Sequence, residues 1–278
     1  LNDGIELKKI VAKADGLQQT ADELCVARHY ANVLFNVMRG GIFEEDYRIE
    51  TKDWAEYIHS MNNLLFETNK KHFEALPAEM EYSQLQKADW ISANPDLTRL
   101  LYEYLPLTFS RRHGDPSRPW DRFDIELKNE DGSRYRAYAG NWRDIFQNWE
   151  ALALSFPTFM TGMIIKFLNA STVDGYNPYR ISREGVDWEV IEPDDSWSYI
   201  GYWGDHQIIY LLKLLEIAKA HGQLDLVKWA NDESLVFANV PYRIRSFDDI
   251  VADPQDTIWF DDQLHEDIEN RVAQLGND

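Results

Sequence analysis

The spacing of the apolar residues limits the fold more than any other feature of the sequence, because they recur every three to four positions over long stretches. Residues 20–38 show the pattern clearly: Thr20 and Glu23 form a capping-box signal, and two glycines after Arg39 end the stretch. The period predicts about eight helices, over residues 20–38, 51–74, 83–104, 141–155, 157–169, 205–221, 223–231 and 262–275. Joined by loops of varied length, these helices are expected to stack as α-hairpins in an all-α fold.

Strand signals are few. Residues 47–50 are predicted to form a short strand, and residues 122–127 and 133–139 a hairpin with its turn at Asp131–Gly132. The segment 170–204 is long for a loop without regular structure, which is usually functional or disordered, and its tryptophans and tyrosines argue against disorder. We therefore expect one domain over residues 1–278, with a β-hairpin insertion at about 120–139.

Charge and cysteine content exclude several classes of protein. The net charge of −20 argues against binding to nucleic acid or to an anionic membrane, since both require a basic surface. Cys25 is the only cysteine, so an intrachain disulfide is impossible, and the first residues lack the layout of a signal peptide. These features predict a cytoplasmic protein. The chain starts at Leu1 rather than Met and is expected to be a fragment of a longer one.

The helix predicted over 141–155 has two different faces. Its apolar stripe must face a core, whereas Arg143 and Gln147 share a second face on which Asp144 and Asn148 lie alongside. Together with Trp142, these side chains offer the short donors and acceptors and the aromatic surface that a sugar ring requires. The alternative is an ordinary helix start whose Arg–Asp pair satisfies loop carbonyls.

A second group of candidates surrounds the helix that follows Asp205. This helix is apolar nearly all round, which predicts a buried inner helix, and Trp203, Asp205, His206 and Gln207 lie at its start. Asp205 is either a helix N-cap or a carboxyl at the mouth of a pocket. Glu189 lies next to an indole, which favours a raised pKa suited to a general acid, although loop carboxylates are more often solvated.

Four arginines gather at residues 111–122 of this acidic chain, and such a group can hold a phosphate or carboxylate or pair with acidic side chains. The candidate anion ligands are Arg111, Arg112 and Arg118, with Arg122 nearby. His113 and Asp115 are too sparse for a metal site, and glycine-rich phosphate loops and zinc motifs are absent from the sequence. No cofactor or metal is therefore expected.

The chain resembles the six-hairpin glycosidases, in particular the cellobiose-phosphorylase-like branch, which includes bacterial proteins of unassigned activity. The resemblance rests on "WRDIFQN" (142–148), which is similar to the family's R-D-x-x-Q-D helix start, on "DGYNPYR" (174–180), and on "DDSWSYIGYWGDHQIIYLLKLLE" (194–216). It implies an (α/α)₆ toroid and a sugar-binding role for Arg143, Asp144 and Gln147, with Asn148 replacing the family's final Asp. Further substrate-binding candidates in these segments are Asn177, Tyr179, Arg180, Trp188, Trp203, His206 and Gln207.

The resemblance also implies an activity. Members of the resembled family cleave glycosidic bonds with inversion, by water or by phosphate, and take their general acid from a D-W-N-D-type segment. This sequence contains no such segment before Asp278. About eight predicted helices are fewer than the twelve of a complete toroid. We therefore expect a fragment of an enzyme acting on an oligosaccharide, with inorganic phosphate as the second substrate if it is a phosphorylase, and with its general acid beyond Asp278. If the chain is instead the whole protein, Asp205 or Glu189 is expected to be the acid. The alternatives are a non-catalytic carbohydrate-binding module and a helical scaffold.

Overall fold

The computed structural model describes residues 31, 43, 45–107, 129–133, 135–173, 175, 177, 180–187, 207–222, 231, 235–254 and 256–278. Seven side chains within its helices and strands lie outside this description, namely those of Asn141, Arg143, Asp144, Ala151, Arg180, Asp187 and Gln207. The helices predicted over 20–38 and 223–231 also lie outside the described residues, apart from Ala31 and Asn231.

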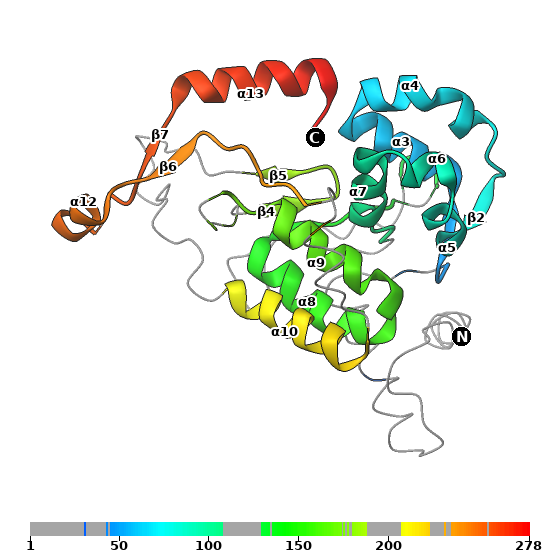
Figure 1. The fold of residues 1–278 in the computed structure, drawn as a ribbon, viewed down its shortest axis with the longest axis horizontal. Helices are drawn as coiled ribbons and strands as arrows, with labels where there is room; N and C mark the ends of the chain where they lie inside the picture. The colour runs from blue at the N-terminus through cyan, green and yellow to red at the C-terminus, as the bar shows by residue number, and fades with distance from the viewer. Residues whose placement is uncertain are drawn as a thin grey trace.

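Phe43 and residues 45–107 form a group of short elements that we call the α3–α7 unit (Figure 1). In chain order its elements are β1 (Arg48–Glu50), α3 (Thr51–Met61), α4 (Asn63–Glu74), β2 (Glu79–Glu81), α5 (Tyr82–Gln86), α6 (Asp89–Ser92) and α7 (Pro95–Glu103). Strands β1 and β2 pair antiparallel, with Ile49 opposite Met80. The predicted strand at 47–50 is confirmed, whereas the two predicted helices that follow it are each divided.

Asparagine residues mark two of these divisions. Asn62 leaves the helical conformation between α3 and α4, and its side chain accepts a hydrogen bond of 2.9 Å from the Leu65 N–H, which caps α4. Asn94 caps α7 in the same way by accepting from the N–H groups of Asp96 and Leu97, and Pro95 occupies the first helical position.

Three further helices follow, which we call the α8–α10 layer: α8 (Trp142–Ser155), α9 (Met160–Asn169) and α10 (Gln207–Ala220). A turn of 3₁₀-helix, η1 (Pro157–Phe159), separates α8 from α9. Helix α10 packs against both α8 and α9, and α9 also packs against α7 of the α3–α7 unit (Figure 1). The seam between α7 and α9 is close: a Cβ atom at Gly162 would lie 2.3 Å from the Tyr102 carbonyl oxygen.

A three-stranded antiparallel sheet leads into α8. Its strands are β3 (Ala139–Asn141), β4 (Arg180–Ser182) and β5 (Val186–Asp187), in the order β3-β4-β5. The prediction that residues 170–204 lack regular structure is therefore wrong for 180–187. A turn is present at Asp131–Gly132, where Gly132 has a φ of 82°, but the described residues 135–138 are not in a strand and β3 pairs with β4. The other predicted arm of that hairpin, 122–127, lies outside the described residues.

The C-terminal part contains elements that the apolar period did not predict. A hairpin of β6 (Tyr242–Ile244) and β7 (Ile258–Phe260) encloses the short helix α12 (Phe247–Ala252). The predicted helix at 262–275 is confirmed as α13 (Asp262–Leu275), which Asp261 caps. Figure 1 shows α13 leading the C-terminus back to the α3–α7 unit.

The last residues bind to the junction between α3 and α4. The N–H of Asn277 donates to the Ser60 carbonyl at 3.2 Å, and that of Asp278 donates to the Met61 carbonyl at 2.9 Å. Gly276 allows this approach, since it has a φ of 111° and a Cβ atom there would lie 2.4 Å from the Met61 oxygen. We call residues 276–278 the C-terminal clamp.

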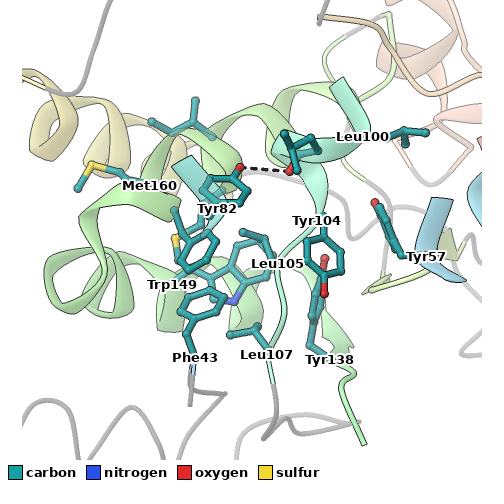
Figure 2. Close-up of a cluster of buried hydrophobic side chains, with 14 of the residues drawn as sticks. Phe43, Tyr57, Tyr82, Leu100, Tyr104, Leu105, Leu107, Tyr138, Trp149 and Met160 are labelled. Atoms are coloured by element: carbon teal, nitrogen blue, oxygen red, sulfur yellow. Dashed lines mark hydrogen bonds between the residues drawn. The ribbon is translucent and has the colours of Figure 1, made fainter. Parts of the chain in front are cut away.

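One core joins the α3–α7 unit to the α8–α10 layer. Figure 2 shows leucines and aromatic rings from both parts converging, including Leu105, Tyr138 and Trp149, and the Tyr82 hydroxyl donates to the Leu101 carbonyl at 3.1 Å. A much smaller apolar cluster lies under the C-terminal hairpin and contains Val240, Tyr242 and Ile258. The two parts of the main core therefore fold against each other over an apolar surface.

The fold class is confirmed in its coarser form: the described residues are mainly helical, with small antiparallel sheets. The (α/α)₆ toroid remains a prediction. The prediction that the helix after Asp205 is buried all round is wrong, because Leu214 packs in the core whereas Ile208 and Leu212 are 63% and 54% exposed. Within the part of the chain that the structure describes, no helix is long and apolar enough to cross a bilayer.

Candidate functional site

The polar face of α8 is the first candidate site, and the β3-β4-β5 sheet holds its start. Strand β3 runs into α8 without a loop, and its last residue, Asn141, is opposite Arg180 of β4. The structure therefore brings together the backbone of two predicted sugar-binding segments, around 142–148 and around Arg180. The helical spacing places Arg143 one turn before Gln147, although the side chains of Arg143, Asp144 and Arg180 lie outside the description.

The described side chains of this face differ in exposure. Gln147 is exposed and Asn148 is half-buried, so both are accessible from outside the core. Glu150, one turn further on, accepts a hydrogen bond of 3.1 Å from Lys213 of α10, and this pair limits the face on the α10 side.

Trp142 is fully buried, which contradicts the prediction that it offers an aromatic surface to a sugar. Its ring packs against Phe146 at 4.8 Å and Phe167 at 5.0 Å between centroids. Spacings of four and seven residues place Trp142, Phe146 and Trp149 on one apolar face of α8, so the indole belongs to the core stripe. Its presence beside the polar residues in the sequence does not place it beside them in space.

Asn177 is also buried, and its side-chain amide donates to the Ser171 hydroxyl at 2.8 Å. This bond stabilises the turn after α9 and engages the amide internally. Gln207 is the first residue of α10, and its side chain lies outside the description. The remaining predicted site residues also lie outside the described residues, namely Asp205, Glu189, Tyr179, Trp188, Trp203, His206, Arg111, Arg112 and Arg118.

The structure adds a second feature that sequence reasoning missed, a polar junction between the α3–α7 unit and the sheet that leads into α8. Asp53, in the first turn of α3, accepts from Arg183 Nη2 at 2.9 Å and from the Tyr104 hydroxyl, and lies 3.8 Å from Arg136 Nη1. Glu50 accepts from Arg136 Nη1 at 2.9 Å and from its Nη2. We call these five residues the Asp53 junction.

Four of the five residues of the Asp53 junction are largely closed to solvent, whereas the side chain of Glu50 is 46% exposed. The side chains of Arg136 and Arg183 are 9% and 10% exposed, and that of Asp53 is 15% exposed. Burial, followed by the negative charge of Asp53, raises the pKa of Tyr104 well above its ordinary value. Burial is the largest single influence on the pKa of Arg183 and lowers it, but the charges of Asp53, Tyr104 and Glu184 and the hydrogen bond to Asp53 together outweigh it and hold that pKa above the ordinary value.

A second buried network joins the same unit to α9 and the C-terminal clamp. Arg99 forms two short contacts with the Asp278 carboxylate, at 2.6 and 2.7 Å, and lies 3.5 Å from Glu103. Glu103 also accepts from Asn169 of α9 at 2.6 Å. Lys166 of α9 donates to the Arg183 carbonyl at 3.1 Å, and its burial lowers its pKa.

These two networks hold structural elements together, and their charged groups are engaged with one another. Each buried carboxylate accepts hydrogen bonds from a guanidinium, phenol or amide, so its charge is compensated where it lies. Among the described residues, no group of acidic, histidine and cysteine side chains is suited to hold a metal ion. No signal in the sequence could have paired Asp53 with Arg183, because 130 positions separate them.

One comparison with known proteins gives a match. Residues 43–106 match the family model described as glycoside hydrolase family 149 insertion domain 1. The matched segment coincides with the α3–α7 unit, so this unit is similar to a domain associated with glycoside hydrolases. No curated protein matches the chain.

Proposed function

We propose that this chain is part of a carbohydrate-active enzyme that cleaves glycosidic bonds of an oligosaccharide with inversion, by hydrolysis or phosphorolysis. The observation that carries the proposal is the match of residues 43–106 to an insertion domain of a glycoside hydrolase family. The α3–α7 unit is then an accessory part, and the α8–α10 layer belongs to a helical-hairpin toroid that bears the sugar subsite.

The sugar subsite in this proposal is the polar face of α8, formed by Arg143, Asp144, Gln147 and Asn148, with Arg180 across the β3–β4 pair. The exposure of Gln147 and the partial exposure of Asn148 support this assignment. The backbone pairing of Asn141 with Arg180 supports it as well, because it joins the two segments at the start of the helix. Trp142 is omitted from the subsite, since its ring is part of the core.

The bond-breaking step in this proposal requires one carboxylic acid. Asp205 or Glu189 protonates the leaving oxygen, while the nucleophile attacks the opposite face of the sugar. Inorganic phosphate attacks directly, whereas water gives its proton to a second carboxylate that acts as general base. Phosphorolysis also needs a site for the phosphate dianion, which we assign to Arg111, Arg112 and Arg118 because guanidinium groups bind phosphate oxygens in pairs.

The experiment incubates the chain with cellohexaose, maltohexaose, laminarihexaose and xylohexaose, with and without inorganic phosphate. Release of reducing sugar in buffer indicates a hydrolase, and release of a sugar phosphate only when phosphate is added indicates a phosphorylase. We expect Arg143→Ala and Asp144→Ala to weaken binding of the active hexasaccharide about tenfold or more, because each removes a charged hydrogen-bonding group. Loss of the general acid through Asp205→Asn or Glu189→Gln should lower turnover about 10²- to 10⁴-fold.

Glu67→Gln is the matched control for these charge changes, since Glu67 pairs with Lys70 on the exposed surface of α4. It should leave binding and turnover unchanged. Binding of a hexasaccharide without any product would support a non-catalytic carbohydrate-binding module. A chain that neither binds nor cleaves any of the four sugars would disprove the carbohydrate assignment.

A further inference from the structure

We propose that Asp53 and Arg183 position the first turn of α8, so that the α3–α7 unit sets the affinity of the sugar-binding face. This inference rests on the proposed function for the identity of the ligand. It concerns residues that do not belong to the subsite, because Asp53 lies in another unit and acts through Arg183.

Arg183 connects three segments of the chain. Its backbone N–H donates to the Tyr138 carbonyl at 2.9 Å, next to the β3–β4 pair, and its Nη1 donates to the Arg136 carbonyl at 2.6 Å. Its Nη2 donates to the Asp53 carboxylate at 2.9 Å. The backbone and side chain of this one residue therefore fix the segment before β3 to the first turn of α3.

The position of the guanidinium is fixed from both sides. Arg183 lies over the rings of Tyr57 and Tyr104, at 5.7 and 5.6 Å from their centroids. Tyr104 also donates its hydroxyl to Asp53, so the carboxylate is held by a second donor. A planar cation between two rings and a carboxylate has little freedom to reorient.

A second ion pair holds the same segment. Arg136 binds both carboxylate oxygens of Glu50, the last residue of β1, while its own carbonyl accepts from Arg183. The α3–α7 unit thus holds residue 136 in two ways. Glu50 binds the Arg136 side chain directly, and Asp53 binds Arg183, which in turn binds the Arg136 carbonyl. Both contacts precede the start of α8 by only a few residues.

The connection from the junction to α8 is short: residues 136–138, which are not in regular structure, lead directly into β3. Tyr138 is followed by β3, which pairs with β4 over its full length, and β3 is followed at once by Trp142 of α8. No loop lies between β3 and α8 that could absorb a displacement. A shift of the segment at residues 136–138 is therefore transmitted to the first turn of α8.

The decisive experiment uses Asp53→Asn, which keeps the shape of the side chain and removes its charge. Hydrogen–deuterium exchange of peptides covering residues 139–146 reports the order of β3 and the first turn without any ligand. We expect exchange there to be accelerated at least about fivefold, and binding of the best of the four hexasaccharides to weaken about fivefold or more. Glu50→Gln removes the charge of the half-exposed carboxylate that binds Arg136. We expect this variant to disturb the junction less than Asp53→Asn does, so it serves as the test if Asp53→Asn does not fold.

Arg99→Gln is the matched control, because it breaks a buried arginine–carboxylate contact of the same unit that leads to the C-terminal clamp. We expect it to accelerate exchange at residues 275–278 and to leave both residues 139–146 and sugar binding within about twofold of the unmodified chain. The inference is overturned if Asp53→Asn and Glu50→Gln leave exchange at 139–146 unchanged, or if Arg99→Gln changes it equally. If no hexasaccharide binds the unmodified chain, the proposed function fails, whereas exchange at 139–146 still decides the positioning role.

Discussion

The α3–α7 unit and the α8–α10 layer share one core but differ in how many large apolar side chains they expose to solvent. Among the described residues of the α3–α7 unit, Leu64 is the one large apolar side chain that is strongly exposed. Helix α10 alone exposes Ile208, Ile209 and Leu212. Five helices pack together in the first part, of which Asn62 and Asn94 cap two, whereas the second part has three helices.

The difference indicates where each part obtains its stability. The α3–α7 unit covers its apolar residues with its own elements and with the seam to α9. In the part of the chain that the structure describes, the α8–α10 layer packs on its inner side, where Trp142, Phe146 and Trp149 face the shared core. Mutations should therefore have very unequal effects on the two sides of this layer.

The largest effect is expected for Trp149→Ala on the inner side of α8. Trp149 is fully buried and packs edge-on against Tyr138 and Phe146, so its removal should lower the free energy of unfolding by about 3–5 kcal/mol. Leu212→Ala on the outer side of α10 should change it by no more than about 0.5 kcal/mol. Guanidinium chloride unfolding of both variants measures the contrast, and similar losses would show that the layer is closed on both sides.

An intermediate effect is expected at the seam between the two parts. Gly162→Ala places a Cβ atom 2.3 Å from the Tyr102 carbonyl oxygen, and separating α9 from α7 to relieve this should cost about 1–3 kcal/mol. Gly185→Ala is the control, because its Cβ atom would meet only Asn277, at 3.9 Å. Thermal unfolding should show a lowered midpoint for the first variant and little change for the second. Equal midpoints for the two variants would mean that α7 and α9 can separate without a loss of stability.

The smallest effect is expected from pH, through the tyrosines of the α3–α7 unit. Burial, followed by the nearby Tyr102, raises the pKa of Tyr82 above its ordinary value, so the folded state keeps a proton that the unfolded state loses at about pH 10. The stabilisation is fully present below pH 10 and is lost as the pH rises above it, at up to about 1.4 kcal/mol per pH unit for this residue.

Tyr82→Phe tests this titration. It removes the hydrogen bond to the Leu101 carbonyl, which should cost about 1 kcal/mol at neutral pH. Above pH 10 the variant should lose stability more slowly than the unmodified chain, and the difference between them should shrink. Parallel stability curves from pH 9 to 11.5 would show that Tyr82 does not titrate on unfolding. Tyr210→Phe on α10 is the control, because Tyr210 is only half-buried. We expect the stability curve of this variant to run parallel to that of the unmodified chain.

The sequence was informative where structure is local. The apolar period identified α8, α9, α10 and α13, and the strand signal identified β1. The division of 51–74 at Asn62 and the start of α7 at Asn94–Pro95 were missed, although an asparagine cap followed by proline is a local signal. The period shows that α10 is apolar on all sides, but it cannot show which of those sides another element covers.

The candidate site depended more on long-range contacts, which the sequence does not reveal. Trp142 was assigned to a sugar site because it precedes Arg143, yet its spacing to Phe146 already placed it on the core face. The pairing of β3 with β4 and the Asp53 junction join segments that lie far apart in the chain, so no local pattern encodes them. The polar face of α8 remains the predicted subsite.

The C-terminal clamp has a consequence for biosynthesis. The α3–α7 unit is complete in sequence at residue 107, yet the carbonyls of Ser60 and Met61 and the guanidinium of Arg99 bind residues 277 and 278. A ribosome that adds about 5–20 residues per second needs on the order of ten seconds to make the intervening chain. During that interval Arg99 has only Asp96 and Glu103 as partners within the unit. The unit can therefore collapse early, but its final contacts form only after residues 277 and 278 have left the ribosome.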